Sequence, residues 1–342
     1  MTKTTHMHAE IRQIPDAVQA LLTSGIGPIK DAAKALRRAD PAFIATVARG
    51  SSDHAATYLK YAAELTTGLP VASIGPSIAS IYEAKLRLRG AACIGISQSG
   101  QSPDIVAMAQ SAQAQGALTV AITNDPASPL ARTSAHCLEI HAGQEHSVAA
   151  TKTFVTSAVA GVALLAHWQQ DEALIAALAA LPEALDAATQ NNWPQLRETM
   201  ATRASLFVLG RGPSYAMSNE AALKFKETCQ IHAESYSSAE VLHGPVAIVA
   251  PHYPVLALAS GDASEPSIVE VADKLSKQGA DVFITSKTAV HSRQLAFART
   301  SHPLLDPLAL IVSFYAFIEQ LSADRGINPD TPRNLKKVTE TI

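Results

Sequence analysis

The chain has 342 residues, of which 47% are hydrophobic and 17% are charged, and its formal net charge is −3. This length exceeds what one hydrophobic core usually serves, so we expect two domains, and the composition excludes a disordered chain. The basic residues are spread along the sequence, which argues against a nucleic-acid partner. The chain has no apolar run long enough to cross a bilayer, and its start lacks the apolar core of a secretory signal. We therefore expect no membrane partner and a cytoplasmic location.

The cysteines and histidines form no pattern typical of a metal site or a disulfide framework. Cys93, Cys137 and Cys229 are far apart and include no Cys-x-x-Cys pair. The 12 histidines lack the spacing that would place several metal ligands on one helical face. We therefore expect free thiols, no metal and no cofactor.

The two halves of the chain repeat each other at a constant offset of 162 residues (207 − 45). The aligned segments are 45–52 with 207–214, 91–96 with 253–258, and 119–123 with 281–285. Three segments in one register indicate an internal duplication.

Each copy alternates short apolar runs with longer Ala-rich stretches, which predicts parallel strands covered by helices on both faces. In the first copy we expect strands at 43–48, 70–74, 91–96, 118–123 and 137–140, and helices at 52–67, 103–115 and 151–168. In the second copy we expect strands at 205–209, 232–236, 254–259, 281–285 and 303–305, and helices at 214–230, 266–278 and 307–323. The fold class is therefore α/β, with two sandwiches in which helices cover both faces of a parallel sheet.

Changes in composition and the positions of helix-interrupting residues divide the chain into five parts. We expect an N-terminal helical segment (1–34), a first α/β domain that binds phosphate (35–170), a helical connector (171–195), a second α/β domain (196–330) and a C-terminal tail (331–342). Within the connector, Pro182 and Pro194 flank an Ala/Leu segment that suits a helix. It should be helical and ordered.

Two loops of the first copy follow strands and open helices, where ligands of such sheets bind. In residues 49–53, Gly50 permits a tight turn, and the hydroxyls of Ser51 and Ser52 could hold an anion at the helix start. The same serines could simply cap the helix. This loop alone does not decide between the two.

The second loop, residues 97–102, has the sequence Ser-Gln-Ser-Gly-Gln-Ser and precedes a helix that begins at Pro103. Three hydroxyls and a glycine are more than one cap requires, and they suit a phosphate at the positive end of a helix dipole. The loop lacks the Gly-Lys-Thr/Ser ending of nucleoside triphosphate sites, so a small metabolite with one phosphate fits better. The equivalent stretch of the second copy has gained Asp262, which indicates that one phosphate site is kept.

The second copy carries a possible acid–base pair instead. Lys224 and Glu227 are three residues apart in an expected helix and so share a face. Such a spacing is common in exposed ion pairs, and by itself it does not establish a catalytic role.

Six motifs, in order along almost the whole chain, resemble the isomerase part of glutamine–fructose-6-phosphate amidotransferase, which is a pair of sugar-isomerase (SIS) domains. The motifs lie at residues 97–102, 149–154, 222–227, 231–234, 240–245 and 330–337, and residues 7–15 resemble the start of that module. The resemblance implies a flavodoxin-like sandwich in each domain and a sugar phosphate as substrate. The implied substrate-binding residues are Gly50, Ser51, Ser52, Ser97, Gln98, Ser99, Ser102, Val148 and Ala150.

The resemblance also implies catalytic roles. Glu227 would move a proton between the first two sugar carbons, and Lys224 would help to place it. His243 would reach in from a second subunit to open the sugar ring, so a homodimer is expected. Lys337 in the tail would close over the open-chain sugar. This assignment suits the chemistry, because proton transfer beside a carbonyl needs a carboxylate and cations to stabilise the intermediate.

Three positions depart from the family pattern. Arg49 stands where the amidotransferase has a cysteine, and Ala150 replaces a hydroxyl residue that contributes to sugar binding. Lys336 stands where an alanine is usual, which leaves the choice between Lys336 and Lys337 open. The amine, the sugar epimer and the reaction direction are open for the same reasons.

Met1 leads straight into the isomerase module, so we expect nitrogen to enter or leave as free ammonia and not from glutamine. The expected reaction converts glucosamine 6-phosphate to fructose 6-phosphate and ammonia. The alternatives are release of an amine from a fructosamine 6-phosphate, isomerisation of a non-amino phosphosugar, and a non-catalytic regulator that binds a sugar phosphate. A regulator would be expected to lose Glu227 or His243, and both are present.

Overall fold

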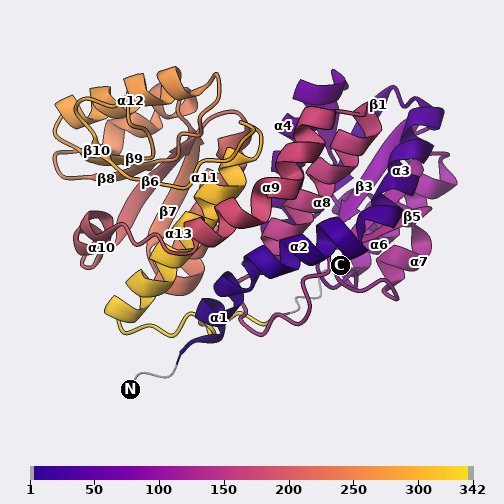
Figure 1. Cartoon of the computed structure of the whole chain (residues 1–342), viewed down its shortest axis with the longest axis horizontal. Coiled ribbons are helices and arrows are strands. Elements are labelled where there is room, and N and C mark those ends of the chain that lie inside the picture. Colours follow the sequence, from indigo (N-terminus) through magenta and orange to yellow (C-terminus); the bar gives the residue numbers. More distant parts are fainter. Residues whose placement is uncertain (1–3, 338–342) are drawn as a thin grey trace. The chain divides into compact units, whose positions relative to one another are not determined.

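Two five-stranded parallel sheets organise the computed structural model, which describes residues 4–337 (Figure 1). The strands of the first sheet are β1 (Phe43–Val47), β2 (Val71–Ser73), β3 (Ala91–Ile96), β4 (Leu118–Thr123) and β5 (His136–Glu139). The strands of the second are β6 (Ser205–Gly210), β7 (His232–Ser237), β8 (Pro254–Ala257), β9 (Asp281–Ile284) and β10 (Arg293–Gln294).

The helices among the described residues fall before, between and after these strands. The first are α1 (His6–Arg12), α2 (Ile14–Ser24), α3 (Ile26–Ala39), α4 (Ser51–Thr67), α5 (Ser77–Ser80), α6 (Pro103–Ala114), α7 (Pro129–Thr133) and α8 (Lys152–Gln169). They are followed by α9 (Glu172–Ala188), α10 (Pro194–Met200), α11 (Pro213–Cys229), α12 (Glu265–Lys277) and α13 (Asp306–Asp324), and by the 3₁₀ turns η1 (Glu240–His243) and η2 (Pro245–Ile248). Helix α9 covers residues 172–188 of the expected connector, with Pro182 inside it.

The chain divides into two compact units, one around each sheet. The first-sheet unit comprises Ile14–Glu145, Lys152–Pro182 and, at the described end of the tail, Lys336 and Lys337. The second-sheet unit comprises residues 4–13, His146–Thr151 and Glu183–Leu335. Segment 146–151 thus belongs to the second-sheet unit, although it comes from the first half of the chain. Lys336 and Lys337 belong to the first-sheet unit, although they come from the second half.

Both sheets have the same topology, which confirms the predicted fold class and duplication. The strand order is β2-β1-β3-β4-β5 in the first sheet and β7-β6-β8-β9-β10 in the second, with every pairing parallel. This is the flavodoxin-like order, in which the direction of strand addition reverses between β1 and β3, and between β6 and β8. Ligands of such sheets bind beyond the carboxyl ends of the strands at this reversal.

In the first-sheet unit, alternation along the strands supplies a core on each face. Ala45 and Cys93 pack with Ile105 and Met108 of α6 on one face. Their buried neighbours Ile44, Ala92 and Ile94 point to the other, because side chains alternate along a strand. Helices α3 and α4 pack against α8, which is buried along nearly its whole length (Figure 1). The parallel sheet is thus covered on both faces, as its apolar strands require.

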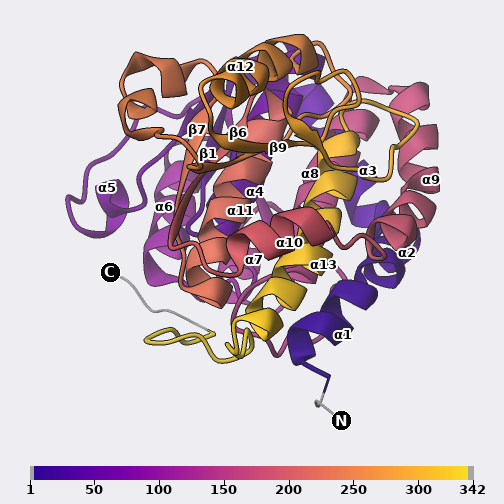
Figure 2. The ribbon, with the colours of Figure 1, turned by 90° about the vertical axis from the view of Figure 1, so that its left-hand side faces the viewer.

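In the second-sheet unit, α12 covers one face of the sheet and α11 packs against α13 (Figure 2). Phe225 of α11 makes edge-to-face contacts with Phe314 and Phe317 of α13. These contacts hold the helix that carries Lys224 and Glu227 against a rigid partner.

The repeat holds closely through the fourth strand of each copy and then fails. Helices α4 and α11 correspond residue for residue at the offset of 162. The predicted strand at 303–305 is wrong, because these residues form a turn and the last strand of the sheet is β10. Leu305 is buried, and its backbone N–H donates to the carbonyl of His302 (2.9 Å) at the start of α13. Its apolar side chain packs beneath the start of a helix. In the sequence, this short apolar run has the same pattern as a buried strand.

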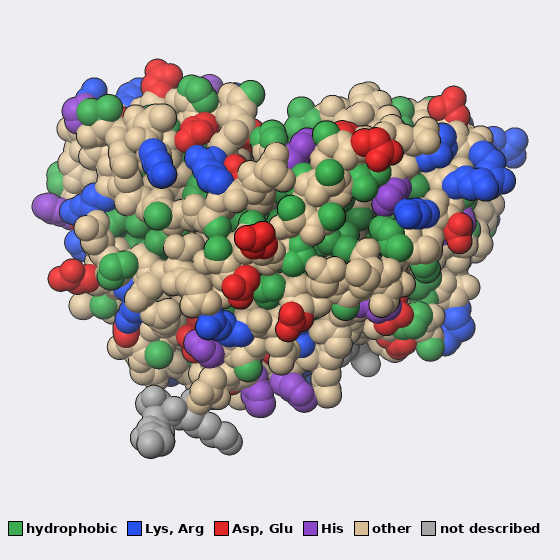
Figure 3. Space-filling model, viewed as in Figure 1, with side chains coloured by type: hydrophobic (Ala, Val, Ile, Leu, Met, Phe, Trp, Pro, Cys, Tyr) green, Lys and Arg blue, Asp and Glu red, His purple; other side chains and the backbone are tan. Residues whose placement is uncertain are grey.

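Among the described residues, Cys93, Cys137 and Cys229 are free thiols, as expected. Burial raises the pKa of the Cys93 thiol, and of the Cys229 thiol, to about 12, so neither is a reactive nucleophile. None of the helices in the described part of the chain is long and apolar enough to span a membrane. On the face shown in Figure 3, basic side chains are interspersed with acidic and neutral ones, apart from a basic group near the right-hand edge.

Candidate active site

The loop of residues 97–102 is folded tightly between β3 and α6. The backbone N–H of Gly100 donates to Ser97 Oγ (3.2 Å), and the N–H of Gln101 donates to Ser99 Oγ (3.3 Å). Gly100 has φ +61°, and a Cβ there would lie 2.1 Å from Ser128 Oγ, so only glycine fits. The loop therefore has a fixed shape before any ligand binds.

Hydroxyl residues lie at the starts of both α4 and α6. The N-cap residues are Gly50, with φ +55°, and Ser102, and neither helix has a side-chain cap hydrogen bond. Ser51 and Ser52 are therefore not the N-cap of α4, whereas Ser102 does occupy the N-cap position of α6. Since β1 and β3 are neighbours, the positive ends of two helices lie at the strand-order reversal, a geometry that favours an anion. The proposed phosphate-binding role of both loops stays a prediction.

Arg49 connects the two loops. Its Nε donates to a carboxylate oxygen of Asp104, the second residue of α6, whose side chain is fully buried. A buried carboxylate requires such a partner, and a cysteine could not supply the charge. The departure from the family pattern at Arg49 thus has a structural reason.

In the second sheet, an acid of the chain itself occupies the equivalent helix start. One oxygen of Asp262 accepts from the N–H of Ser264 (2.8 Å) and the Ser264 hydroxyl (2.6 Å), and the other accepts from the Ser260 hydroxyl (3.1 Å). A Cβ at Gly212, the counterpart of Gly50, would lie 3.9 Å from the same carboxylate. The carboxylate of Asp262 accepts the hydrogen bonds that a bound phosphate would otherwise accept. This supports a phosphate site in the first sheet only.

Lys224 is not part of an exposed ion pair. Its ammonium is fully buried and binds Glu227 Oε2 at 2.7 Å and Glu220 Oε1 at 3.0 Å. Glu220 is also fully buried, and its Oε1 accepts from the Tyr315 hydroxyl of α13 (3.1 Å). The Glu227 side chain is 18% exposed and so is the member of this group that a ligand can reach.

The charge of Lys224 is fixed by its neighbours. Burial alone would lower the pKa of the Lys224 amine, but the carboxylates of Glu220 and Glu227 outweigh burial and raise it well above its ordinary value. The partly exposed carboxylate of Glu227 is therefore held in one orientation by the ammonium of Lys224. A carboxylate held in this way is suited to accept and return a proton at a sugar carbon.

The other predicted residues of the second-sheet unit lie in two different segments. His243 is exposed at the end of η1, and in the described part of the chain no hydrogen bond or ion pair joins it to Glu227. Val148 and Ala150 are partly buried in the segment 146–151. The carboxylate of Glu10 in α1 accepts from the backbone N–H of Ser147 (3.2 Å) and holds that segment.

In the first-sheet unit, the tail residue Lys337 binds Glu145, with Nζ 2.7 Å from Oε2, whereas Lys336 is exposed. The sequence did not draw attention to Glu145, Glu220 or Tyr315. The four-residue spacing of Glu220 and Lys224 could have pointed to Glu220. Glu145 and Lys337 are 192 residues apart, so their contact had no local signal.

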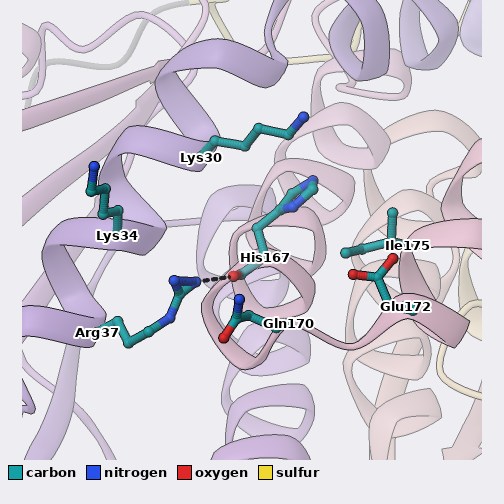
Figure 4. Close-up of a pocket in the computed structure, with 7 residues that line it drawn as sticks. All are labelled: Lys30, Lys34, Arg37, His167, Gln170, Glu172 and Ile175. Carbon is teal, nitrogen blue, oxygen red and sulfur yellow. Dashed lines mark hydrogen bonds between the residues drawn. The ribbon is translucent and has the colours of Figure 1, made fainter.

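A pocket of about 300 Å³ lies elsewhere in the first-sheet unit, as Figure 4 shows. It is lined by Lys30, Lys34, Arg37, His167, Gln170, Glu172 and Ile175. Arg37 donates to the carbonyls of His167 (2.6 Å) and Trp168 (3.1 Å) and thereby caps the end of α8. Glu145 contacts the opposite end of this 18-residue helix, about 27 Å away, so the pocket is separate from that contact.

Comparisons with known proteins agree with this geometry. The SIS domain family matches residues 39–167 and 199–299. A glutamine–fructose-6-phosphate aminotransferase [isomerizing] of Symbiobacterium thermophilum is 32% identical over 94% of this chain and 55% of its own length. The chain thus spans about half of the curated relatives it matches.

Two solved structures extend the comparison. A protein of Silicibacter pomeroyi DSS-3, provisionally named a phosphosugar isomerase, is 60% identical, with a TM-score of 0.94 over 96% of this chain and 100% of that one. The C-terminal domain of glucosamine-fructose-6-phosphate aminotransferase from Francisella tularensis is 25% identical, with a TM-score of 0.87 over 97% of this chain and 99% of that one. The resemblance inferred from the six motifs is confirmed.

Proposed function

This chain belongs to the SIS-domain family, and we propose that it is a phosphosugar isomerase that converts glucosamine 6-phosphate and water to fructose 6-phosphate and ammonia. The similar aminotransferases are named for fructose 6-phosphate, which supports this pair of sugars. The observation that carries the proposal is the carboxylate of Glu227, partly exposed and held 2.7 Å from the buried ammonium of Lys224.

In this proposal, Glu227 takes the proton from C2 of the open-chain amino sugar and returns it to C1. The carbonyl at C1 becomes an alcohol and C2 becomes an imine, which water then converts to the ketone with release of ammonia. Lys224 orients the carboxylate, and the Lys337 ammonium stabilises the negative charge that develops on the intermediate. His243 is proposed to open the sugar ring, a step that suits an imidazole because its two ring nitrogens can donate and accept a hydrogen bond.

The substrate phosphate is proposed to bind at the starts of α4 and α6. Replacing Ser97 and Ser99 together by alanine should weaken sugar-phosphate binding at least about tenfold, since each lost hydrogen bond to a charged group is worth about 1.5–3 kcal/mol. Calorimetric titration with fructose 6-phosphate measures this, and Ser267→Ala on α12 serves as the control. Unchanged affinity in the double variant, with the fold intact, would place the phosphate elsewhere.

The reaction itself is tested by incubating the protein with glucosamine 6-phosphate, without glutamine and in the presence of a chelator. We expect ammonia and fructose 6-phosphate in equal amounts, together with exchange of the C1 hydrogen with solvent deuterium. Binding of the sugar with neither product nor exchange would contradict the proposal. Exchange without ammonia would identify a plain aldose–ketose isomerase, and release of an amine only from a fructosamine 6-phosphate would move the same chemistry to another substrate.

A further inference from the structure

The described end of the C-terminal tail contacts the first-sheet unit at a buried carboxylate. Lys337 Nζ lies 2.7 Å from Glu145 Oε2, and the side chains of Lys337 and Glu145 are 26% and 0% exposed. A fully buried carboxylate that binds an ammonium differs from a surface ion pair, because little water competes for the carboxylate.

Glu145 itself has a fixed position. Its Oε1 accepts from the backbone N–H of Thr153 (3.2 Å), and its Oε2 accepts from the Thr153 hydroxyl (2.7 Å). Thr153 is the second residue of α8, so the carboxylate lies at the positive end of that helix dipole.

The segment before Glu145 is also held in place. Asn124, which follows β4, donates to the carbonyl of Gly143 (2.7 Å) and accepts from the N–H of Ala142 (3.0 Å). Lys152 Nζ donates to the carbonyl of Gln144. The Glu145 carboxylate is therefore a preformed docking point for the tail.

This docking point is at the same edge of the sheet as the loops proposed to bind phosphate. Glu145 follows β5, and residues 97–102 follow β3, two strands away in a parallel sheet. With neighbouring strands about 4.8 Å apart, β3 and β5 are about 10 Å apart, a distance that an extended hexose phosphate can span. Glu145 lies beyond the end of β5, in a segment held to the end of β4 by Asn124, so a cation bound there can meet the far end of a sugar whose phosphate is bound after β3.

We propose that Glu145 is a positioning residue that docks the tail and presents Lys337 to the sugar as a fixed ammonium. The inference rests on the proposed function, because it gives the contact a catalytic purpose only if Lys337 acts on the substrate. Held by Glu145, Lys337 can place its positive charge beside the intermediate and stabilise it. The inference also selects Lys337 over the exposed Lys336.

The simpler alternative is that Glu145 only caps α8 and that Lys337 contributes nothing. Thr153→Val distinguishes the proposal from this alternative. It removes the hydroxyl that donates to Glu145 but keeps the Glu145 carboxylate and Lys337. Lys336→Ala is the matched control within the tail. Neither variant should loosen the tail if the proposal is correct.

The test compares Glu145→Gln, Lys337→Met and the double variant in the full chain. Hydrogen exchange of backbone amides in residues 331–337 should become about tenfold faster in all three, because the contact that opposes local opening is lost. The value of kcat/KM for glucosamine 6-phosphate should fall by up to about a hundredfold, the effect expected when a reacting group is misplaced by about 1 Å. The double variant should be no worse than either single variant, since both remove one interaction.

Tail exchange is measured whether or not the sugar is turned over, so failure of the inference can be told apart from failure of the proposed function. Unchanged exchange in Lys337→Met, a variant in the tail that leaves Glu145 and the core in place, would overturn the docking. Faster exchange with unchanged kcat/KM in an active enzyme would overturn the positioning role. If Glu145→Gln loses kcat/KM but Lys337→Met keeps it, Glu145 serves α8 and the inference is wrong.

Discussion

Glu227→Gln should lower turnover of glucosamine 6-phosphate by about 10²–10⁴-fold, the usual contribution of a general acid–base residue. The amide has nearly the same shape and can still accept a hydrogen bond from Lys224, but it cannot take a proton from C2. The change should therefore appear in kcat, with a smaller change in the binding of fructose 6-phosphate measured by calorimetry. Glu270→Gln, an exposed position on α12 of the same unit, is the matched control and should keep full activity.

The same variant tests the proposal that His243 acts in the active site of a second subunit. Glu227→Gln and His243→Ala should each be inactive alone and regain part of the activity when mixed, because hybrid dimers contain one intact site. Absence of recovery despite demonstrated subunit exchange would show that each site is built from one chain. Full activity of Glu227→Gln would remove the residue from the mechanism altogether.

Much of the fold could be predicted because the signals were local and repeated. The Ala-rich helices and apolar strands recur at one offset, and α4 and α11 have corresponding boundaries at that offset. The prediction failed after β9, where the copies diverge and the offset no longer aligns the segments. There, buried Leu305 precedes a helix and is not part of a strand. Burial alone does not distinguish these two environments in a short apolar run.

The candidate site was predictable only where its functional residues lie close together in one segment of the sequence. The glycine and hydroxyls of residues 97–102 lie in one loop, and Lys224 and Glu227 lie on one helix, so spacing and motif were informative. The burial of Lys224 was not visible, because it depends on packing of α11 against α13. The contact of Arg49 with Asp104 likewise joins the loop after β1 to the start of α6, and only the three-dimensional arrangement reveals it.

The buried charges on α11 make Lys224 a position where substitution should cost much stability. Lys224→Met preserves the length of the side chain but leaves the carboxylates of Glu220 and Glu227 without their shared cation. Removing one partner of a buried ion pair typically destabilises a protein by about 3–5 kcal/mol. Urea unfolding at neutral pH should show a loss of this size, whereas Lys226→Met, exposed two residues further along the same helix, should change stability by less than about 0.5 kcal/mol.

The raised pKa of Lys224 adds a dependence on pH whose sign is fixed. An amine whose pKa is higher in the folded than in the unfolded protein contributes stability that is complete below the unfolded value of 10.5 and is lost as the pH rises above it. Wild type should therefore lose its advantage over Lys224→Met as the pH increases from about 9.5 to about 11.5, while other alkaline effects act on both proteins and cancel in the difference. A stability difference that stays constant or widens over this range would mean that the two carboxylates do not hold the charge on Lys224. The ammonium that orients Glu227 would then need another explanation.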